Sequence, residues 1–240
     1  MRFLPLTMFW ALGVIWGSNF IYMKWAAEVI SPEQVVLLRI LFGLIPVAVY
    51  AWWKSALKWA HMRHLGHFLV MAVVGVIAYY YGFAKGSSLL LSSVTGALSG
   101  LTPIVSFVLA FLLLREEKVT LLKGLGILLG FVGVTLIARP FAADLAASNL
   151  EGVIYAGIGS LGVGASFVYV KRYLLPLNIS APALITYQLS LSLIILSFII
   201  SWEGIGAVWG SPHVAAGLVL GLGLLGTGFA YIIYYYETSV

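Results

Sequence analysis

A single arginine stands inside an otherwise apolar stretch of the sequence, and its chemistry suits a charged ligand. Arg39 follows Pro32 by seven residues, about 10 Å along a helix that rises roughly 1.5 Å per residue. Its guanidinium could hold a carboxylate or a phosphate group through two parallel hydrogen bonds. Alternatively, the long side chain extends to the nearest polar layer or ties helix ends together. The sequence leaves both roles open.

Hydroxyl side chains recur at helical spacing further along the chain. Five of them, at Ser92, Thr95, Ser99, Thr102 and Ser106, are separated by 3, 4, 3 and 4 residues, which places them on one face of a continuous helix. Such a face turns toward a neighbouring helix or a water-filled cavity, and the sequence does not choose between the two. The proline after Thr102 could bend this helix because it removes a backbone hydrogen bond.

Groups that run metal or acid–base chemistry are sparse. His61, His64 and His67 recur every third residue, but no cysteine or nearby aspartate completes a metal site, so we interpret them as a basic interfacial loop. No aspartate or glutamate falls in the middle of an apolar block, where a proton-coupled carrier usually holds one. Hydrolase and zinc-protease motifs are absent from the sequence. We therefore expect no metal, no cofactor and no enzymatic activity.

The composition places these residues in a membrane. The 240 residues are 62% hydrophobic, 9% charged and free of cysteine, with a mean hydropathy of +1.07, whereas soluble domains are about 45–50% apolar and about 25% charged. Apolar blocks of about 20 residues can cross a hydrocarbon core of about 30 Å as helices. We expect an all-α polytopic membrane protein with eight spans, at 4–24, 34–53, 67–84, 88–114, 120–138, 152–173, 182–202 and 214–236.

The basic residues indicate the orientation of the chain. With the N-terminus in the cytoplasm, nine of the 13 Lys and Arg residues fall in cytoplasmic segments and three on the far side, while Arg39 lies within a span. The net charge of +5 is then a signal of topology and not of a nucleic-acid surface. The expected partners are a small-molecule solute and membrane lipids, with no nucleic acid, and a homodimer is left open.

The chain contains an internal repeat. The segment WGSNFIYMK at 16–24 recurs as VGASFVYVK at 163–171, an offset of 147, and Tyr80 recurs as Tyr231. Because the repeating unit holds five helices, an odd number, its second copy enters the membrane upside down, as in many secondary transporters. We expect a first repeat of five spans over 1–140 and a second, truncated repeat of three spans over 150–240.

The matched positions define a candidate binding pocket. Tyr80 and Tyr231 lie deeper than the other late tyrosines, which are expected at the headgroup level. The first helix, through Trp16 and Asn19, and the matched sixth helix would face them across the repeat interface. Such a pocket would receive a small solute with an apolar body and a few polar groups. The predicted substrate-binding residues are Trp16, Asn19, Arg39, Tyr80, Thr95, Ser99, Thr102, Ser166, Tyr169 and Tyr231.

The chain resembles the EamA type of the drug/metabolite transporter superfamily. The resemblance rests on Trp-Gly-Ser-Asn-Phe at 16–20, Ser-Pro at 31–32 followed by Arg39, the run 97–103 ahead of Leu-Leu-Arg-Glu-Glu at 113–117, and the glycine-rich stretch 123–134. It covers essentially the whole chain and implies ten helices in two five-helix repeats, with both ends cytoplasmic, in the bacterial inner membrane. Compared with that pattern, helices nine and ten are missing here.

Together these features predict a transporter of small metabolites, amino acids or drug-like solutes that works by alternating access. Facilitated diffusion, exchange or export is favoured because no carboxylate stands in mid-span. The alternatives are a non-transporting truncated subunit or remnant that needs a partner, a membrane-embedded enzyme, and a channel, although no ring of charges or filter sequence is present.

Overall fold

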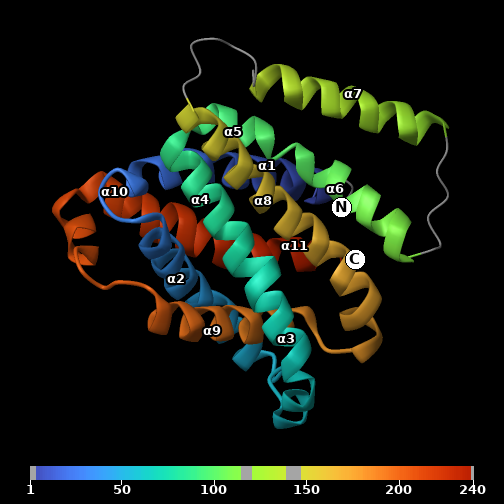
Figure 1. Cartoon of the computed structure of the whole chain (residues 1–240). Helices are drawn as coiled ribbons and strands as arrows, with labels where there is room; N and C mark the ends of the chain where they lie inside the picture. Colours follow the sequence, from blue (N-terminus) through green and yellow to red (C-terminus); the bar gives the residue numbers. More distant parts are fainter. Residues whose placement is uncertain (1–3, 115–120, 139–146, 239–240) are drawn as a thin grey trace.

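The fold is helical throughout the residues that the structure describes. The computed structural model describes residues 4–114, 121–138 and 147–238, and every regular element within these ranges is a helix (Figure 1). Seven helices there are long and apolar enough to cross a membrane, and an eighth, α7, contains a shorter apolar stretch, Leu122–Gly133. The predicted class, an all-α polytopic membrane protein, is confirmed.

The helices follow one another with short connections. In chain order they are α1 (Leu4–Ala27), α2 (Pro32–Trp53), the 3₁₀ turn η1 (Trp59–His64), α3 (Leu65–Met71), the π-helical η2 (Ala72–Ala78), α4 (Tyr79–Leu89), α5 (Ser92–Leu98), α6 (Leu101–Leu114), α7 (Leu121–Ala138), α8 (Ala147–Tyr169), the π-helical η3 (Val170–Leu174), η4 (Leu175–Leu177), α9 (Ala181–Ile199), η5 (Ile205–Gly210), α10 (Pro212–Ala216), the π-helical η6 (Gly217–Phe229) and α11 (Ala230–Thr238).

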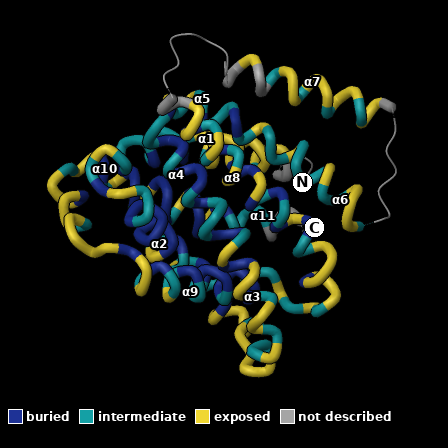
Figure 2. The backbone as a smooth tube through the Cα atoms, viewed as in Figure 1, coloured by how far each residue is buried: buried dark blue, intermediate teal, exposed yellow. Residues whose placement is uncertain are grey.

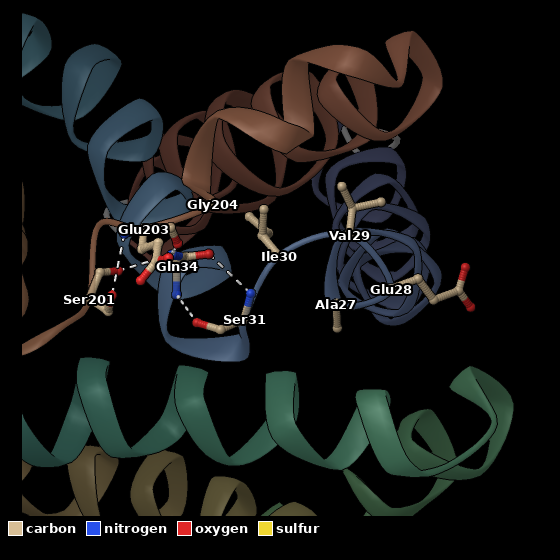
Figure 3. Close-up of a pocket in the computed structure, with 9 residues that line it drawn as sticks. All are labelled: Ala27, Glu28, Val29, Ile30, Ser31, Gln34, Ser201, Glu203 and Gly204. Carbon is tan, nitrogen blue, oxygen red and sulfur yellow. Dashed lines mark hydrogen bonds between the residues drawn. The ribbon is translucent and has the colours of Figure 1, made fainter.

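Helix α2, which carries Arg39, has a well-defined start. The Ser31 hydroxyl accepts the backbone N–H of Gln34 at 3.4 Å, and the Gln34 side chain accepts the backbone N–H of Ser31 at 3.1 Å, a reciprocal cap. Pro32 at the first helical position supplies the fixed φ that a helix start requires. The Gln34 amide also donates to the carbonyls of Ser201 and Glu203, at 2.9 and 2.7 Å, beside a cavity of about 400 Å³ (Figure 3). These bonds fix the start of α2 against the loop after α9.

Two spans differ from the sequence-based boundaries. The predicted span 67–84 is longer, because a continuous helical stretch runs over Trp59–Leu89 through η1, α3, η2 and α4. The predicted span 88–114 is interrupted by a turn at Ser99–Gly100 between α5 and α6. The break falls four residues before Pro103, because the proline ring clashes with the carbonyl of the residue four positions earlier.

The buried core lies where α2, α4, α9 and η6 meet, and α6 and α7 lie at the outside (Figure 2). Fully buried side chains such as Ile40, Leu189 and Leu222 come from these central helices. The outer surface is apolar as well, with Phe198 87% exposed and Leu129 70% exposed. An apolar outer surface of this extent suits lipid, in which a helix satisfies its own backbone hydrogen bonds.

Helices α4 and α8 approach each other to backbone contact. A Cβ placed on Gly82 would lie 2.7 Å from the Tyr155 carbonyl oxygen and 2.8 Å from the Cα of Gly159. Only glycine at this position permits such a close approach, which is how small residues pack helices in membranes. The contact fixes α4, the helix that carries Tyr80.

The basic residues at the helix ends separate to opposite ends of the bundle. The Lys24 ammonium donates to the carbonyl of Ser88 at 3.1 Å, where α1 and α4 end. Lys171 lies in η3, which leads to the loop that meets the end of α2. Two π-helical segments, Ala72–Ala78 and Gly217–Phe229, also fall in the third helix of each expected repeat. An inverted repeat requires Lys24 and Lys171 to lie at opposite ends of the bundle. The repeat boundaries 1–140 and 150–240 stay a prediction.

Candidate functional site

Arg39 lies in the centre of the bundle. Its side chain is 2% exposed and is surrounded by α1, α4 and η6. Helix α2 delivers it there because Pro32 and the Ser31 cap set the helix start seven and eight residues earlier. The interpretation of Arg39 as a residue that extends to a polar surface layer is therefore wrong.

Neutral groups surround the guanidinium. Its Nε donates to the Thr227 hydroxyl at 3.0 Å, and its Nη1 lies 3.8 Å from the Met23 sulfur. The guanidinium carbon stands 3.8 Å above the centre of the Tyr80 ring, a cation–π contact. The neighbouring Tyr79 side chain also interacts with the guanidinium, and its ring centroid lies 4.6 Å from that of Tyr80.

Within the side chains that the structure describes, Arg39 has no carboxylate partner. A buried charge costs several kcal/mol unless it is paired, and a neutral hydroxyl or an aromatic ring compensates for only part of that cost. A carboxylate or phosphate brought to this position would form charge-assisted hydrogen bonds with the guanidinium. The site is therefore chemically suited to an anionic group.

Tyr80 and Tyr231, the predicted pocket walls, meet at this cluster. The Tyr80 hydroxyl lies 3.4 Å from the hydroxyl of Tyr231 and 3.5 Å from that of Thr227, at the long limit of hydrogen bonding. Asn19 adjoins them, because its side chain packs directly against Gly226. The absence of a side chain at Gly226 leaves room for it. The Asn19 side-chain oxygen is buried and has no hydrogen-bond partner among the described residues. A buried oxygen without a donor is a position where a ligand N–H or O–H can bind.

Thr227 is a member of this cluster that the sequence analysis did not single out. Its hydroxyl accepts from Arg39 and donates to the Leu222 carbonyl at 3.0 Å, five residues earlier, as the π-helical winding of η6 allows. A Cβ on Gly43 would lie 2.6 Å from the Thr227 Cβ, so the absence of a side chain at Gly43 lets η6 approach α2. The available signal was a threonine in the stretch 217–228, which contains five glycines. The structure shows this stretch as a π-helix, and π-helical segments often mark functional sites.

The hydroxyl stripe of the fourth predicted span is not part of this cluster. The break at Ser99–Gly100 divides it between α5 and α6, so the hydroxyls do not lie on one uninterrupted helix, and the common face stays a prediction. Thr95 bonds the Leu91 carbonyl at 3.4 Å and Ser99 bonds the Gly96 carbonyl at 2.6 Å. Thr102 follows the break, and its backbone N–H donates to the Ser99 carbonyl at 2.9 Å.

The remaining predicted residues also lie apart from Arg39. Ser166 bonds its own helix at the Val163 carbonyl, 2.7 Å away, and packs on Gly75. The Tyr169 hydroxyl lies 2.8 Å from Nδ1 of His67. Trp16 is 36% exposed and faces Tyr234, with ring centroids 6.2 Å apart. None of these contacts involves Tyr80 or Tyr231, so the expectation that the three side chains face those tyrosines stays a prediction. Helix α1 itself reaches the cluster through Asn19 and Met23.

The three histidines of the loop do not converge. His61 pairs with the Tyr187 hydroxyl at 3.2 Å, His64 accepts from Arg63, and His67 pairs with Tyr169. Among the described residues no group of three His, Asp or Glu side chains could hold a metal ion.

The sequence has relatives among proteins that are named as transporters but are uncharacterized. The model of the EamA-like transporter family matches residues 4–139. The chain is 25% identical to an uncharacterized transporter of Archaeoglobus fulgidus over 224 residues, which is 92% of this chain and 75% of the relative. It is 24% identical to the uncharacterized transporter YoaV of Bacillus subtilis over 225 residues, 93% of this chain and 75% of that protein. No solved structure matches. Since the family model covers more than half of the 240 residues, the chain belongs to the EamA-like transporter family.

Proposed function

We propose that this transporter carries small solutes that bear a carboxylate, and that Arg39 binds this group. The observation that supports the proposal is a buried guanidinium with only neutral partners in the described part of the chain. Amino acids and small organic acids have the required group. Tyr80 and Tyr231 would contact the apolar body of the solute, and Asn19 would accept a hydrogen bond from it.

Alternating access is the proposed mechanism, and the burial of the cluster supports it. Tyr80 is 1% exposed and Thr227 is fully buried, so a solute reaches Arg39 only after neighbouring helices separate. Glycine-rich π-helical η6 is the element suited to that movement, because Gly223 and Gly228 pack without side chains of their own against α2. Opening toward one side of the membrane at a time would carry the solute across.

Facilitated diffusion or exchange is the proposed mode of transport. The described spans hold no carboxylate near Arg39 that could take up and release a coupling proton. A solute carboxylate that neutralises Arg39 would itself be the group that permits the conformational change. Exchange between two such solutes then needs no other ion.

The test is solute flux in proteoliposomes that contain the purified chain. A panel of radiolabelled amino acids and monocarboxylic acids is compared with the corresponding amides, which lack the charge. We expect saturable uptake of at least one carboxylate and little uptake of its amide. Equal uptake of an acid and its amide would contradict the proposal.

The variant Arg39→Gln tests the residue itself. We expect flux to fall at least about tenfold, since hydrogen bonds between charged groups contribute roughly 1.5–3 kcal/mol. Arg172→Gln is the matched control, because Arg172 is exposed and, among the described residues, contacts the carbonyl of Leu113 at a helix end and the Tyr173 ring. Tyr231→Phe removes a single hydroxyl and keeps the ring, so it separates a binding effect from a loss of folding. Unchanged flux in both site variants would place the binding site elsewhere.

A further inference from the structure

A second cavity lies at the end of the bundle that the charge pattern predicts to be cytoplasmic. It has a volume of about 410 Å³ and is formed where α2 ends, the following loop turns, and α9 begins. Its lining contains two lysines, a histidine and an asparagine but no acidic residue; the lining residues are Tyr50, Lys54, Ser55, Ala56, Lys58, His61, Asn178, Ser180 and Pro182. This composition favours an anion.

The cations of this cavity have no acidic partner among the described residues. The Lys54 ammonium stands 4.9 Å from the Trp53 ring and 5.8 Å from the Tyr50 ring, so aromatic faces are its neighbours. Lys58 is held through its backbone, whose N–H donates to the Tyr187 hydroxyl at 3.0 Å and whose carbonyl accepts from it at 3.2 Å. The backbone bonds leave the Lys58 ammonium available for a ligand.

The loop that carries the cavity is held in place. The Tyr187 ring stacks on Phe68 with centroids 4.9 Å apart, and its hydroxyl lies 3.2 Å from Nδ1 of His61. Helix α9 supplies Tyr187 and α3 supplies Phe68, so the two lysines project from a segment that is fixed against two helices. A fixed pair of cations loses less side-chain entropy on binding than two free surface lysines.

The surroundings of the cavity are those of a membrane interface. Trp52, Trp53 and Trp59 are 76%, 72% and 90% exposed, and exposed tryptophans are characteristic of the headgroup level. Ile45 and Val49 extend the exposed apolar face of α2 from Trp52 toward the middle of the helix. A ligand with a charged head and apolar chains could occupy the cavity and this face at once, whereas a free phosphate would use only the cavity.

We propose that this cavity binds the phosphate headgroup of an anionic phospholipid from the adjacent leaflet, with Lys54 and Lys58 pairing with the phosphate and the acyl chains lying on the exposed face of α2. Basic pockets between membrane helices are suited to such headgroups. Asn178 and Ser180 also line the cavity and can bond the remaining headgroup oxygens. The proposal does not depend on Arg39 or on the solute that is carried.

The test is native mass spectrometry of the purified chain after incubation with phosphatidylglycerol or phosphatidylcholine at equal concentration. We expect retained phosphatidylglycerol and little retained phosphatidylcholine. The double variant Lys54→Gln with Lys58→Gln should reduce retained phosphatidylglycerol about tenfold or more, because each lysine contributes to the attraction. The double variant Arg63→Gln with Lys123→Gln removes two positive charges outside the cavity and should retain the lipid within about twofold of the unchanged chain.

Ala56→Trp fills the cavity while both lysines remain, and its retained phosphatidylglycerol should also fall. If the lipid were held by a diffuse basic surface, Ala56→Trp would retain phosphatidylglycerol and the two charge variants would lose it equally. That result would overturn the proposal. Displacement of phosphatidylglycerol by inorganic phosphate at equal concentration would show a site for free phosphate and would overturn it as well. Monodisperse elution of each variant in detergent confirms that it is folded.

Discussion

Replacing Gly82 by alanine is expected to force α4 and α8 apart. The added Cβ would lie 2.7 Å from the carbonyl oxygen of Tyr155 and 2.8 Å from the Cα of Gly159. Carbon atoms pack best at roughly 3.5–4.0 Å, so the two backbones would have to separate by about 1 Å. Neither contact involves a flexible side chain that could turn away.

The magnitude follows from two opposing terms. Overpacking a close interface costs about 1–3 kcal/mol, and alanine regains up to about 1 kcal/mol over glycine in a helix. We expect a net loss of about 1–2 kcal/mol in the free energy of unfolding. The separation would also displace Tyr80, two residues away on α4, so solute flux should fall with stability.

The assay is unfolding in mixed micelles by titration with sodium dodecyl sulfate, followed by circular dichroism, together with solute flux in proteoliposomes. Gly157→Ala is the matched control, since Gly157 lies on the same helix as Gly159 and nothing stands within 4 Å of its added Cβ. That control should be neutral or slightly stabilising. If both variants lost the same stability, backbone contact between α4 and α8 would not be the cause.

Two further predictions concern the helix ends. Ser31→Ala should destabilise the chain by about 1 kcal/mol in the same unfolding titration because it removes the cap of α2; Ser180→Ala should cost much less, because the Ser180 side chain makes no cap bond, and equal losses would contradict the capping argument. Single cysteines at Lys24 and Lys171 should be labelled by a membrane-impermeant maleimide from opposite sides of the bilayer, since these residues lie at opposite ends of the bundle. Labelling of both from one side would contradict the inverted repeat.

The sequence predicted the large features of the fold because they depend on local composition. Apolar blocks of membrane-spanning length are visible without any tertiary contact, and Ser31-Pro32 marks the start of α2 through bonds within four residues. Arg39 was recognisable as a candidate because a lone charge in an apolar span is costly wherever it points. The matched tyrosines, Tyr80 and Tyr231, were found through the repeat, and they do meet.

The rest of the site could not be derived from helical periodicity. The hydroxyl stripe assumed one straight helix, and the clash that Pro103 creates four residues earlier divides it. Trp16, Ser166 and Tyr169 were placed toward Tyr80 and Tyr231 by analogy between repeats, but which side chains α1 and α8 turn toward the site depends on their packing partners. An apolar helix in lipid has no polar outer face to fix its rotation, so only contacts between helices decide it.

The sequence alone determined that this chain is a bundle of membrane helices of the EamA type with a lone arginine inside an apolar span. Only the tertiary structure decided what surrounds it. Thr227 reaches Arg39 because η6 is wound as a π-helix and Gly43 lets it approach α2, and neither condition is expressed in the pattern of apolar residues. Contacts between residues 188 positions apart depend on how helices pack, which no local spacing encodes.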